Sequence, residues 1–224
     1  SYGPMAGVVI AFEKFIPAKG IFASKWVGLD NFRYLIELPD SMRVLWNTIY
    51  IAFMKIVAHL VIPILFALLL NEVVIEKFKR TVQTLIYLPH FLSWIILGGI
   101  LIDILSPSNG IVNYFLGLVG IPSIYFLGDN TWFPLVLVGS DVWKEFGFNT
   151  IVYLAALTSI NPALYEAAIV DGAGRWKQTL HITLPGMLPI IILLMTLSLG
   201  NVLNAGFDQV FNLYSPQVYE SGDI

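Results

Sequence analysis

The chain contains no cysteine and few charged residues. Because cysteine is absent, disulfide bonds and thiolate metal sites are excluded. Charged side chains make up only 12% of the residues and hydrophobic ones 57%, whereas soluble domains are about one-quarter charged. This composition indicates that much of the chain is solvated by lipid rather than by water.

Basic patches and catalytic motifs are missing as well. The net charge is −3, and no basic patch is interleaved with aromatic residues, so we expect no nucleic-acid partner. The sequence has neither an H-E-x-x-H nor a G-x-S-x-G motif. Its histidines, His59, His90 and His181, are not at ligand spacing for a metal ion. We therefore expect no enzyme and no metal site.

Long apolar runs are what the sequence does contain. A helix needs about 20 apolar residues to cross a bilayer, and the segments that qualify are 45–70, 82–105, 132–157 and 187–211. The opening run SYGPMAGVVIAF lacks an initiator methionine and a basic leader. We interpret residues 1–12 as the end of a further span and the chain as part of a longer polypeptide. The pattern predicts an all-α, polytopic transmembrane helix bundle that forms a single domain over 1–224.

The segment 132–157 carries charge in its centre. It contains Asp141, Lys144 and Glu145, and each charge costs roughly 2.5–3.5 kcal/mol at the middle of a membrane helix. Such a helix crosses the membrane only if the charged turn faces other protein or water. We therefore expect this span to line an interior path.

One polar loop, 158–186, separates two of the spans. Asn161-Pro162 is typical of a helix start, and Gly172 is typical of a helix end. A second amphipathic stretch then runs from Arg175 to Ile182, and we expect Leu184-Pro185 to end it and to start the next span. The loop fits two interpretations, a surface hairpin without a partner or a unit that docks into a groove of another protein.

The spacing within this loop resembles a family signature. The pattern E-A-A-x3-G-x9-I-x-L-P is similar to the "EAA" signature of binding-protein-dependent ABC importer permeases, and Asp171 and Ala173 fit its fuller form. Other stretches, such as WVGLDNF and FALLLNEV, resemble the polysaccharide and oligosaccharide branch, which includes permeases for alginate or pectin fragments. The matching residues are Glu166, Ala167, Ala168, Asp171, Gly172, Ala173, Ile182, Leu184 and Pro185.

The resemblance implies a fold, partners and a location. It implies the type I ABC importer permease fold in a bacterial cytoplasmic membrane, with loop 158–186 on the cytoplasmic side. There the loop would couple to a dimeric ATP-binding subunit, which holds ATP and magnesium, whereas this chain holds no cofactor. A second permease subunit, usually a different chain, and an extracytoplasmic sugar-binding protein would complete an importer of oligo- or polysaccharide with alternating access.

Polar residues within the spans are the candidates for the substrate path, because burial in a membrane makes each of them costly. Carboxamides and carboxylates bond sugar hydroxyls, and tryptophan rings stack on pyranose rings. Several candidates recur at helical spacing and so share a face. The candidates are Asp141, Lys144, Glu145, Asn149, Ser198, Asn201, Asn204, Asp208, His90, Trp94, Lys55 and His59.

Structural roles are open for several of these candidates. Asp141 and Lys144 also fit an internal ion pair that lets the helix insert, and Asn201 and Asn204 fit bonds between helices. His90 also fits a bond to the carbonyl group that Pro89 frees. Alternatively, Lys55, His59 and His90 form a basic wall suited to sugars rich in uronate.

Two other classes of membrane protein are compatible with the same features. A secondary transporter of a polar solute also has polar residues at mid-membrane, but it works without an ATPase. A purely structural membrane subunit would not need the charged turn in 132–157. Co-purification with a nucleotide-binding subunit distinguishes these classes from an ABC permease.

Overall fold

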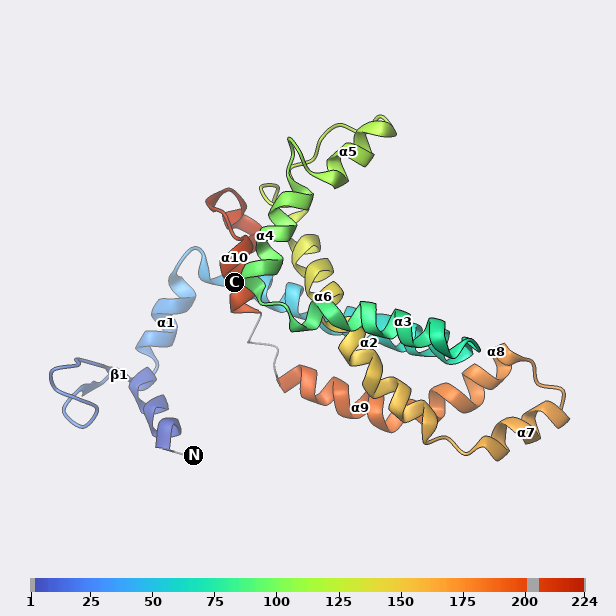
Figure 1. The fold of residues 1–224 in the computed structure, drawn as a ribbon. Helices are drawn as coiled ribbons and strands as arrows, with labels where there is room; N and C mark the ends of the chain where they lie inside the picture. Colours follow the sequence, from blue (N-terminus) through green and yellow to red (C-terminus); the bar gives the residue numbers. More distant parts are fainter. Residues whose placement is uncertain (1–2, 201–205, 224) are drawn as a thin grey trace. The chain divides into compact units, whose positions relative to one another are not determined.

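The computed structural model describes residues 3–200 and 206–223, and it is predominantly helical (Figure 1). The expected all-α class is confirmed. The one β pairing within these two ranges is an antiparallel ladder of β1 (Glu13–Lys14) with β2 (Lys25–Trp26). The chain divides into two compact units, Ser1–Asn47 and Thr48–Asp223.

The first unit packs around a small aromatic cluster. It contains a 3₁₀ helix, η1 (Gly3–Phe12), the β ladder, and α1 (Asp30–Glu37). The Phe12 ring lies 5.7 Å from the Trp26 ring and 5.4 Å from the Phe32 ring. Asn31 donates from its carboxamide to the backbone oxygens of Ala11 and Glu13, each at 2.9 Å. These bonds fix the start of α1 against the end of η1.

Two long helices occupy the expected spans 45–70 and 132–157. They are α2 (Ser41–Glu72), with 32 residues, and α6 (Phe133–Thr158), with 26. At about 1.5 Å per residue each exceeds the roughly 30 Å of a bilayer core. In α6 a proline occupies the first turn, where its missing N–H costs no hydrogen bond.

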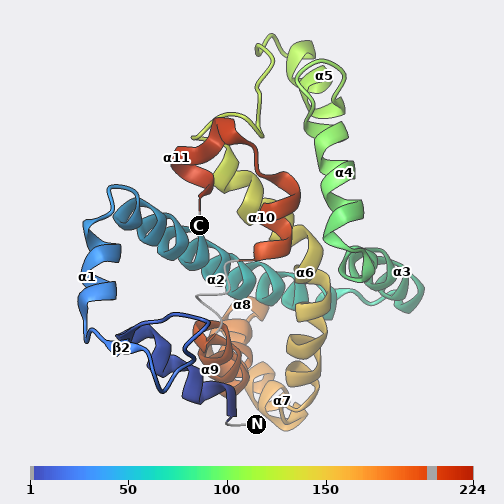
Figure 2. The same cartoon turned by 90° about the vertical axis from the view of Figure 1, so that its left-hand side faces the viewer.

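The expected span over 82–105 is a broken helix rather than a straight one. It consists of α3 (Glu76–Tyr87), a 3₁₀ turn, η2 (Leu88–Phe91), and α4 (Trp94–Leu105), with a bend of 105° at the break. Pro89 cannot donate a backbone hydrogen bond, and Ser93 begins a new helix by accepting from the Ile96 N–H at 3.4 Å. Figures 1 and 2 show α4 turning away from α3.

The polar loop folds into α7 (Pro162–Val170) and α8 (Arg175–Gln178). The expected helix end at Leu184-Pro185 is wrong, because α8 continues through a π turn, η3 (Thr179–Thr183), into α9 (Leu184–Gly200). In this turn the Leu184 N–H bonds the Thr179 oxygen, five residues back. The wider turn accommodates a proline that would otherwise break the helix.

The last expected span, 187–211, is not one continuous helix in the structure. Helix α9 is described as far as Gly200, where the described range stops, and α10 (Phe207–Leu213) begins after Gly206, whose φ is +82°. Because Gly206 adopts a left-handed conformation, α10 is a separate helix. The described part of the second unit also contains three short elements: α5 (Ile111–Leu118), η5 (Pro216–Val218) and α11 (Tyr219–Gly222).

Glycines allow helices of the second unit to approach closely. A Cβ atom at Gly147 of α6 would overlap the carbonyl oxygen of Ile86 in α3, and one at Gly98 of α4 would lie 3.1 Å from Asn212 Cβ in α10. The core where α2, α6 and α9 meet is formed by buried Ala67, Tyr153, Leu157, Ile160 and Met187.

By length and composition, two helices in the described ranges suit a membrane crossing, Ser41–Glu72 and Arg175–Gly200. The bent pair is a third if it counts as one span. Helix α6 is long enough as well, but it carries three charged residues in one turn. How those charges are accommodated decides whether α6 belongs to the bundle interior.

Candidate functional site

The loop between α6 and α9 is a helical hairpin of α7 and α8, and both ends of α7 are capped. The Asn161 side chain accepts from the Ala163 N–H at 3.0 Å, as expected of an N-cap. At the other end of α7, Gly172 has φ +74°. The Ala173 N–H bonds the Ala168 oxygen at 2.8 Å, and the Gly172 N–H bonds the Ile169 oxygen at 3.0 Å. This pair of bonds is a complete Schellman motif, which ends the helix and satisfies the carbonyl groups of Ala168 and Ile169.

Side-chain bonds tie this hairpin to the spans. The Tyr165 hydroxyl lies 2.9 Å from Thr183 Oγ1, which joins α7 to the π turn. Arg175 of α8 bonds Glu72 at the end of α2, with 2.7 Å between Nη1 and Oε2. The hairpin therefore connects to α6 and α9 through the chain and to α2 through this ion pair.

The outer face of the hairpin is exposed and partly apolar. Helix α7 has no buried residue, and Ile169, Val170 and Trp176 are 64%, 87% and 73% exposed. Of the signature residues, Glu166, Ala167, Asp171, Gly172 and Pro185 are exposed, and Ala168, Ala173, Ile182 and Leu184 are half-buried. A rigid element that exposes such side chains is suited to contact another protein.

The charged turn of α6 is paired across helices. Asp141 Oδ2 lies 2.9 Å from His59 Nε2 and 3.7 Å from Lys55 Nζ, both on α2. Asn149 Nδ2 lies 3.1 Å from the other ring nitrogen of His59. If the amide donates there, His59 carries its proton on Nε2 and donates it to Asp141. These residues, Asp141 and Asn149 of α6 with Lys55 and His59 of α2, are called the first charged set. The set connects two turns of α6 with one turn of α2.

A second charged set lies beside the helix break. Glu145 Oε2 is 2.7 Å from His90 Nδ1, and Glu145 Oε1 is 3.0 Å from Lys144 Nζ. Lys144 Nζ also donates to the backbone oxygen of His90 at 2.7 Å and lies 5.9 Å from the centre of the Trp94 ring. The His90 ring stacks on Phe148 at 4.2 Å. The second charged set therefore holds α6 against η2 and α4.

These contacts correct two of the structural alternatives. The ion pair within α6 that we considered, between Asp141 and Lys144, is not formed, since each pairs with different groups. His90 does not bond a freed carbonyl. Its ring binds Glu145, and Lys144 bonds the oxygen of His90 itself. The bases of the proposed basic wall, His59 and His90, each contact a carboxylate instead of standing alone.

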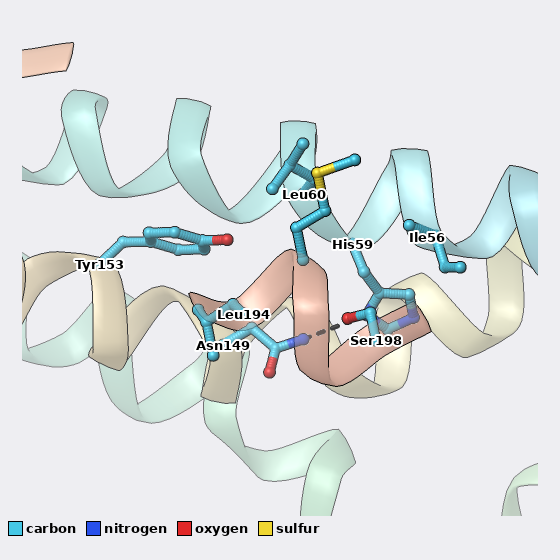
Figure 3. A pocket seen from close by; sticks show the side chains of 8 residues that line it. Ile56, His59, Leu60, Asn149, Tyr153, Leu194 and Ser198 are labelled. Atoms are coloured by element: carbon cyan, nitrogen blue, oxygen red, sulfur yellow. Dashed lines mark hydrogen bonds between the residues drawn. The ribbon is translucent and has the colours of Figure 1, made fainter. Parts of the chain in front are cut away.

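A small cavity lies next to the first charged set (Figure 3). Its volume is about 100 Å³, and the side chains of His59, Asn149 and Ser198 border it together with Tyr153. It brings together polar groups of α2, α6 and α9, three of them predicted path residues. The other residues that line it are apolar: Ile56, Leu60, Leu194 and Met195.

Four of the predicted path residues, Ser198, Asn201, Asn204 and Asp208, belong to the last expected span. Two of them, Asn201 and Asn204, lie outside the described residues. Asp208 is exposed, because the turn at Gly206 breaks the helical register on which its prediction depended. Among the described residues no group of acidic or histidine side chains is arranged to hold a metal ion.

Gln209 and Ser140 are two polar residues of the interior that the sequence did not predict. Gln209 is fully buried in α10, and its amide contacts both Lys55 and Ser140. The one feature of the sequence that hints at the position of Gln209 is Gly206. Its left-handed conformation turns the chain so that Gln209 points to the inner side. Ser140 is an ordinary small residue of α6 in the sequence, with nothing to distinguish it.

Comparison with known families settles the class of this protein. Residues 59–207 match the family model described as "Binding-protein-dependent transport system inner membrane component". The chain belongs to this family. The matched range of the permease includes the charged turn of α6, the α7–α8 hairpin and α9.

Several relatives of the permease carry the names of saccharide transport systems. The chain is 42% identical to the polygalacturonan/rhamnogalacturonan transport system permease protein YteP of Bacillus subtilis, over all of this chain and 70% of the relative. A crystal structure of a bacterial ABC transporter involved in the import of the acidic polysaccharide alginate matches with TM-score 0.89 and 42% identity. That match covers 100% of this chain and 74% of the other.

A second solved structure shows a relative with a partner. It is a bacterial alginate ABC transporter in complex with an alginate pentasaccharide-bound periplasmic protein, and it matches with TM-score 0.90 and 41% identity. It covers the same shares, 100% and 74%. The expected ABC importer permease fold, of the polysaccharide-related branch, is thus confirmed for this permease.

Proposed function

We propose that this chain is the permease subunit of an ATP-driven importer of oligo- or polysaccharide. The observation that carries the proposal is the capped, exposed α7–α8 hairpin, which presents the EAA signature from the point where two spans meet. Family membership supports the transport role, and the names of the most similar relatives support the sugar class.

The hairpin is the unit through which we expect ATP binding to act. A dimeric ATP-binding subunit, which holds ATP and magnesium, grips residues 162–174, and its closure moves the hairpin as a rigid body. The Schellman motif and the Tyr165–Thr183 contact make it stiff enough to transmit that movement. The movement reaches α6 and α9 through the chain and α2 through the Arg175–Glu72 ion pair.

The spans then alternate access to a polar interior path. The first charged set and the cavity beside it supply the carboxamide, imidazole and hydroxyl groups that bond sugar hydroxyls. This chain performs no bond chemistry. A second permease subunit of a different sequence, and an extracytoplasmic sugar-binding protein that delivers the substrate, complete the assembly in a bacterial inner membrane.

Acidic sugars are the substrate class that the interior supports best. Lys55 is a buried ammonium on the face of α2 that meets α6, where it lies 3.7 Å from the Asp141 carboxylate. Two relatives carry names of acidic polysaccharide systems. We therefore propose that uronate-containing oligosaccharides pass along this face.

A transport assay tests the proposal. The tagged chain is purified from its native membrane with the subunits that accompany it and reconstituted into liposomes with the binding protein. We expect uptake of an oligogalacturonate or an oligoalginate to require ATP and to persist without an ion gradient. Uptake driven by an ion gradient in the absence of an ATP-binding subunit would instead establish a secondary transporter.

The Lys55→Met variant tests the acidic substrate class. Loss of the ammonium should raise the KM for an acidic oligosaccharide about tenfold or more, since hydrogen bonds to charged groups are strong. Unchanged uptake at unchanged protein level would remove Lys55 from the path and leave the ATP-driven mechanism intact.

A further inference from the structure

Tyr153 of α6 is a buried tyrosine whose hydroxyl group bonds no described residue. Its side chain is 1% exposed, and it belongs to the apolar core cluster with Ala67, Leu157, Ile160 and Met187. A phenylalanine would fill the same space among these neighbours. Because a buried hydroxyl group without a partner is unfavourable, the tyrosine points to a partner from outside the described chain.

The Tyr153 hydroxyl points into the cavity beside the first charged set (Figure 3). Ser198 of α9 borders the same cavity and adds a second hydroxyl group. The cavity therefore combines an apolar wall with two hydroxyl groups from different helices, which is the kind of lining that orients a small polar group.

The cavity has room for a group of several heavy atoms. Its volume is about 100 Å³, whereas one water molecule needs roughly 10–15 Å³ of such space. Its α9 wall includes Met195, which is 44% exposed, and a methionine side chain is flexible enough to turn aside. A substituent of a sugar ring therefore has a short route from the surface of α9 to the Tyr153 hydroxyl.

The lining favours an uncharged ligand. Of the described residues that border the cavity, only His59 is basic. Its two ring nitrogens already contact Asp141 and Asn149, at 2.9 and 3.1 Å. A carboxylate placed in the cavity would therefore meet no available cation. A hydroxyl group both donates and accepts, so it matches the hydroxyl groups of Tyr153 and Ser198.

We propose that Tyr153 is a specificity-determining residue, which together with Ser198 binds an uncharged hydroxyl or hydroxymethyl group of the imported sugar. The cavity then recognises one position on a sugar ring, and the carboxylates of an acidic oligosaccharide stay outside it. This inference rests on the proposed function, because it names the part of the substrate that this cavity takes.

Tyr153→Phe removes the hydroxyl group and keeps the ring. The test uses the reconstituted complex with its binding protein and the oligogalacturonate or oligoalginate that the wild type imports. We expect kcat/KM for uptake to fall about three- to tenfold, because one hydrogen bond between neutral groups is lost. The midpoint of thermal unfolding should not fall, since no described residue loses a partner.

Singly deoxygenated derivatives of the same sugar show whether the contact is direct. In the wild type, one derivative should be imported less well than the parent sugar because it lacks the hydroxyl group that Tyr153 meets. In Tyr153→Phe the preference for the parent over that derivative should shrink three- to tenfold, whereas the other derivatives keep their wild-type ratios. The binding protein is the same in both complexes, so its own preference among the sugars cancels in this comparison.

Tyr50→Phe is the matched control. Tyr50 is 44% exposed on α2 and is not among the residues that line the cavity, so its loss should change neither the uptake nor the ratios. Ser198→Ala removes the second hydroxyl group and should weaken the preference at the same position of the sugar. It provides an independent route if Tyr153→Phe is not recovered in the membrane.

Unchanged ratios in Tyr153→Phe or in Ser198→Ala, with or without a uniform loss of uptake, would show that the cavity takes water only, and they overturn the inference. Wild-type complex that imports no acidic oligosaccharide overturns the proposed function together with the inference. Normal wild-type import with unchanged ratios in the variants overturns the inference alone.

Discussion

Each charged residue of the α6 turn is paired with a group on another element. Asp141 meets α2, whereas Lys144 and Glu145 meet η2. A lone charge at the bilayer centre costs roughly 2.5–3.5 kcal/mol on the insertion scale, and pairing across helices offsets that cost only after the bundle has formed. The charged turn therefore makes the insertion of α6 depend on its neighbours.

Replacement of the single residue Lys144 tests this pairing. Its side chain is 10% exposed, and Lys144→Met leaves Glu145, 27% exposed, with only the His90 ring. Removing one member of a buried pair costs roughly 3 kcal/mol, whereas removing both is often nearly neutral. We expect Lys144→Met to lower the midpoint of thermal unfolding in detergent and Lys144→Met with Glu145→Gln to recover it. Equal midpoints for the single variant and the wild type would contradict the pairing.

Gly147 gives a second prediction. An added Cβ would overlap the Ile86 oxygen, so Gly147→Ala forces α3 away from α6. Overpacking of this kind costs about 1–3 kcal/mol. The matched control is Gly139→Ala in the same helix, where a Cβ meets nothing within 4 Å. Thermal unfolding should distinguish the two, with a lower midpoint for Gly147→Ala only. If both alanine variants unfold alike, the close approach of α3 to α6 is absent.

The sequence predicted which polar residues share a face of a helix, but it did not predict which residue of another helix each one contacts. Helical spacing places Lys55 with His59 on one face of α2, and Asp141 with Glu145 on one face of α6. In the structure Asp141 meets Lys55 and His59, whereas Glu145 meets His90 and Lys144 instead. Which acid meets which base depends on the relative rotation of helices, and that is set by packing that no local pattern encodes. Gln209 was invisible for the same reason, since its inward direction depends on the turn at Gly206.

At the scale of elements, the hairpin was the most predictable part. Asn161-Pro162 and Gly172 act within a few residues, so their capping geometry could be anticipated and is observed. Pro89 and Pro185 have different effects on the helices that contain them. At Pro89 the helix breaks with a 105° bend, whereas at Pro185 it continues through a π turn. Which outcome occurs depends on how neighbouring helices pack, so the local sequence around a proline does not predict it.

The end of α7 gives a prediction for a whole element. Gly172 has φ +74°, whereas Gly174 has φ −69°, and neither would bring a Cβ within 4 Å of another group. Gly172→Ala therefore costs about 1–2 kcal/mol of backbone strain and loosens the Schellman turn, while Gly174→Ala does not. We expect ATP hydrolysis stimulated by the sugar-loaded binding protein to fall several-fold in Gly172→Ala, and further in Gly172→Pro.

The control for this experiment is basal ATP hydrolysis and the amount of inserted chain, which all three variants should share with the wild type. Stimulation that is equal in Gly172→Ala and Gly174→Ala would show that hairpin geometry does not matter for coupling. Retained transport in Gly172→Pro would oppose the docking proposal itself.

At the scale of the whole molecule, the proposed function makes the chain one component of an assembly. The chain spans about 70% of the length of YteP, and it exposes large apolar side chains on most of its described helices. Lipid and partner subunits are the surroundings that such surfaces require. The absence of cysteine has a practical consequence here, because any introduced cysteine is the only thiol in this chain.

Crosslinking from the hairpin is the most direct test of the central claim. A single cysteine replaces Val170, which is 87% exposed on α7, and a matched one replaces Leu118, 65% exposed on α5. In membranes that contain the assembled transporter, a short thiol crosslinker should join the Val170→Cys variant, but not the Leu118→Cys variant, to the ATP-binding subunit. The account is contradicted if the Val170→Cys variant joins no other polypeptide, or if a membrane-impermeant thiol reagent labels it from outside intact cells.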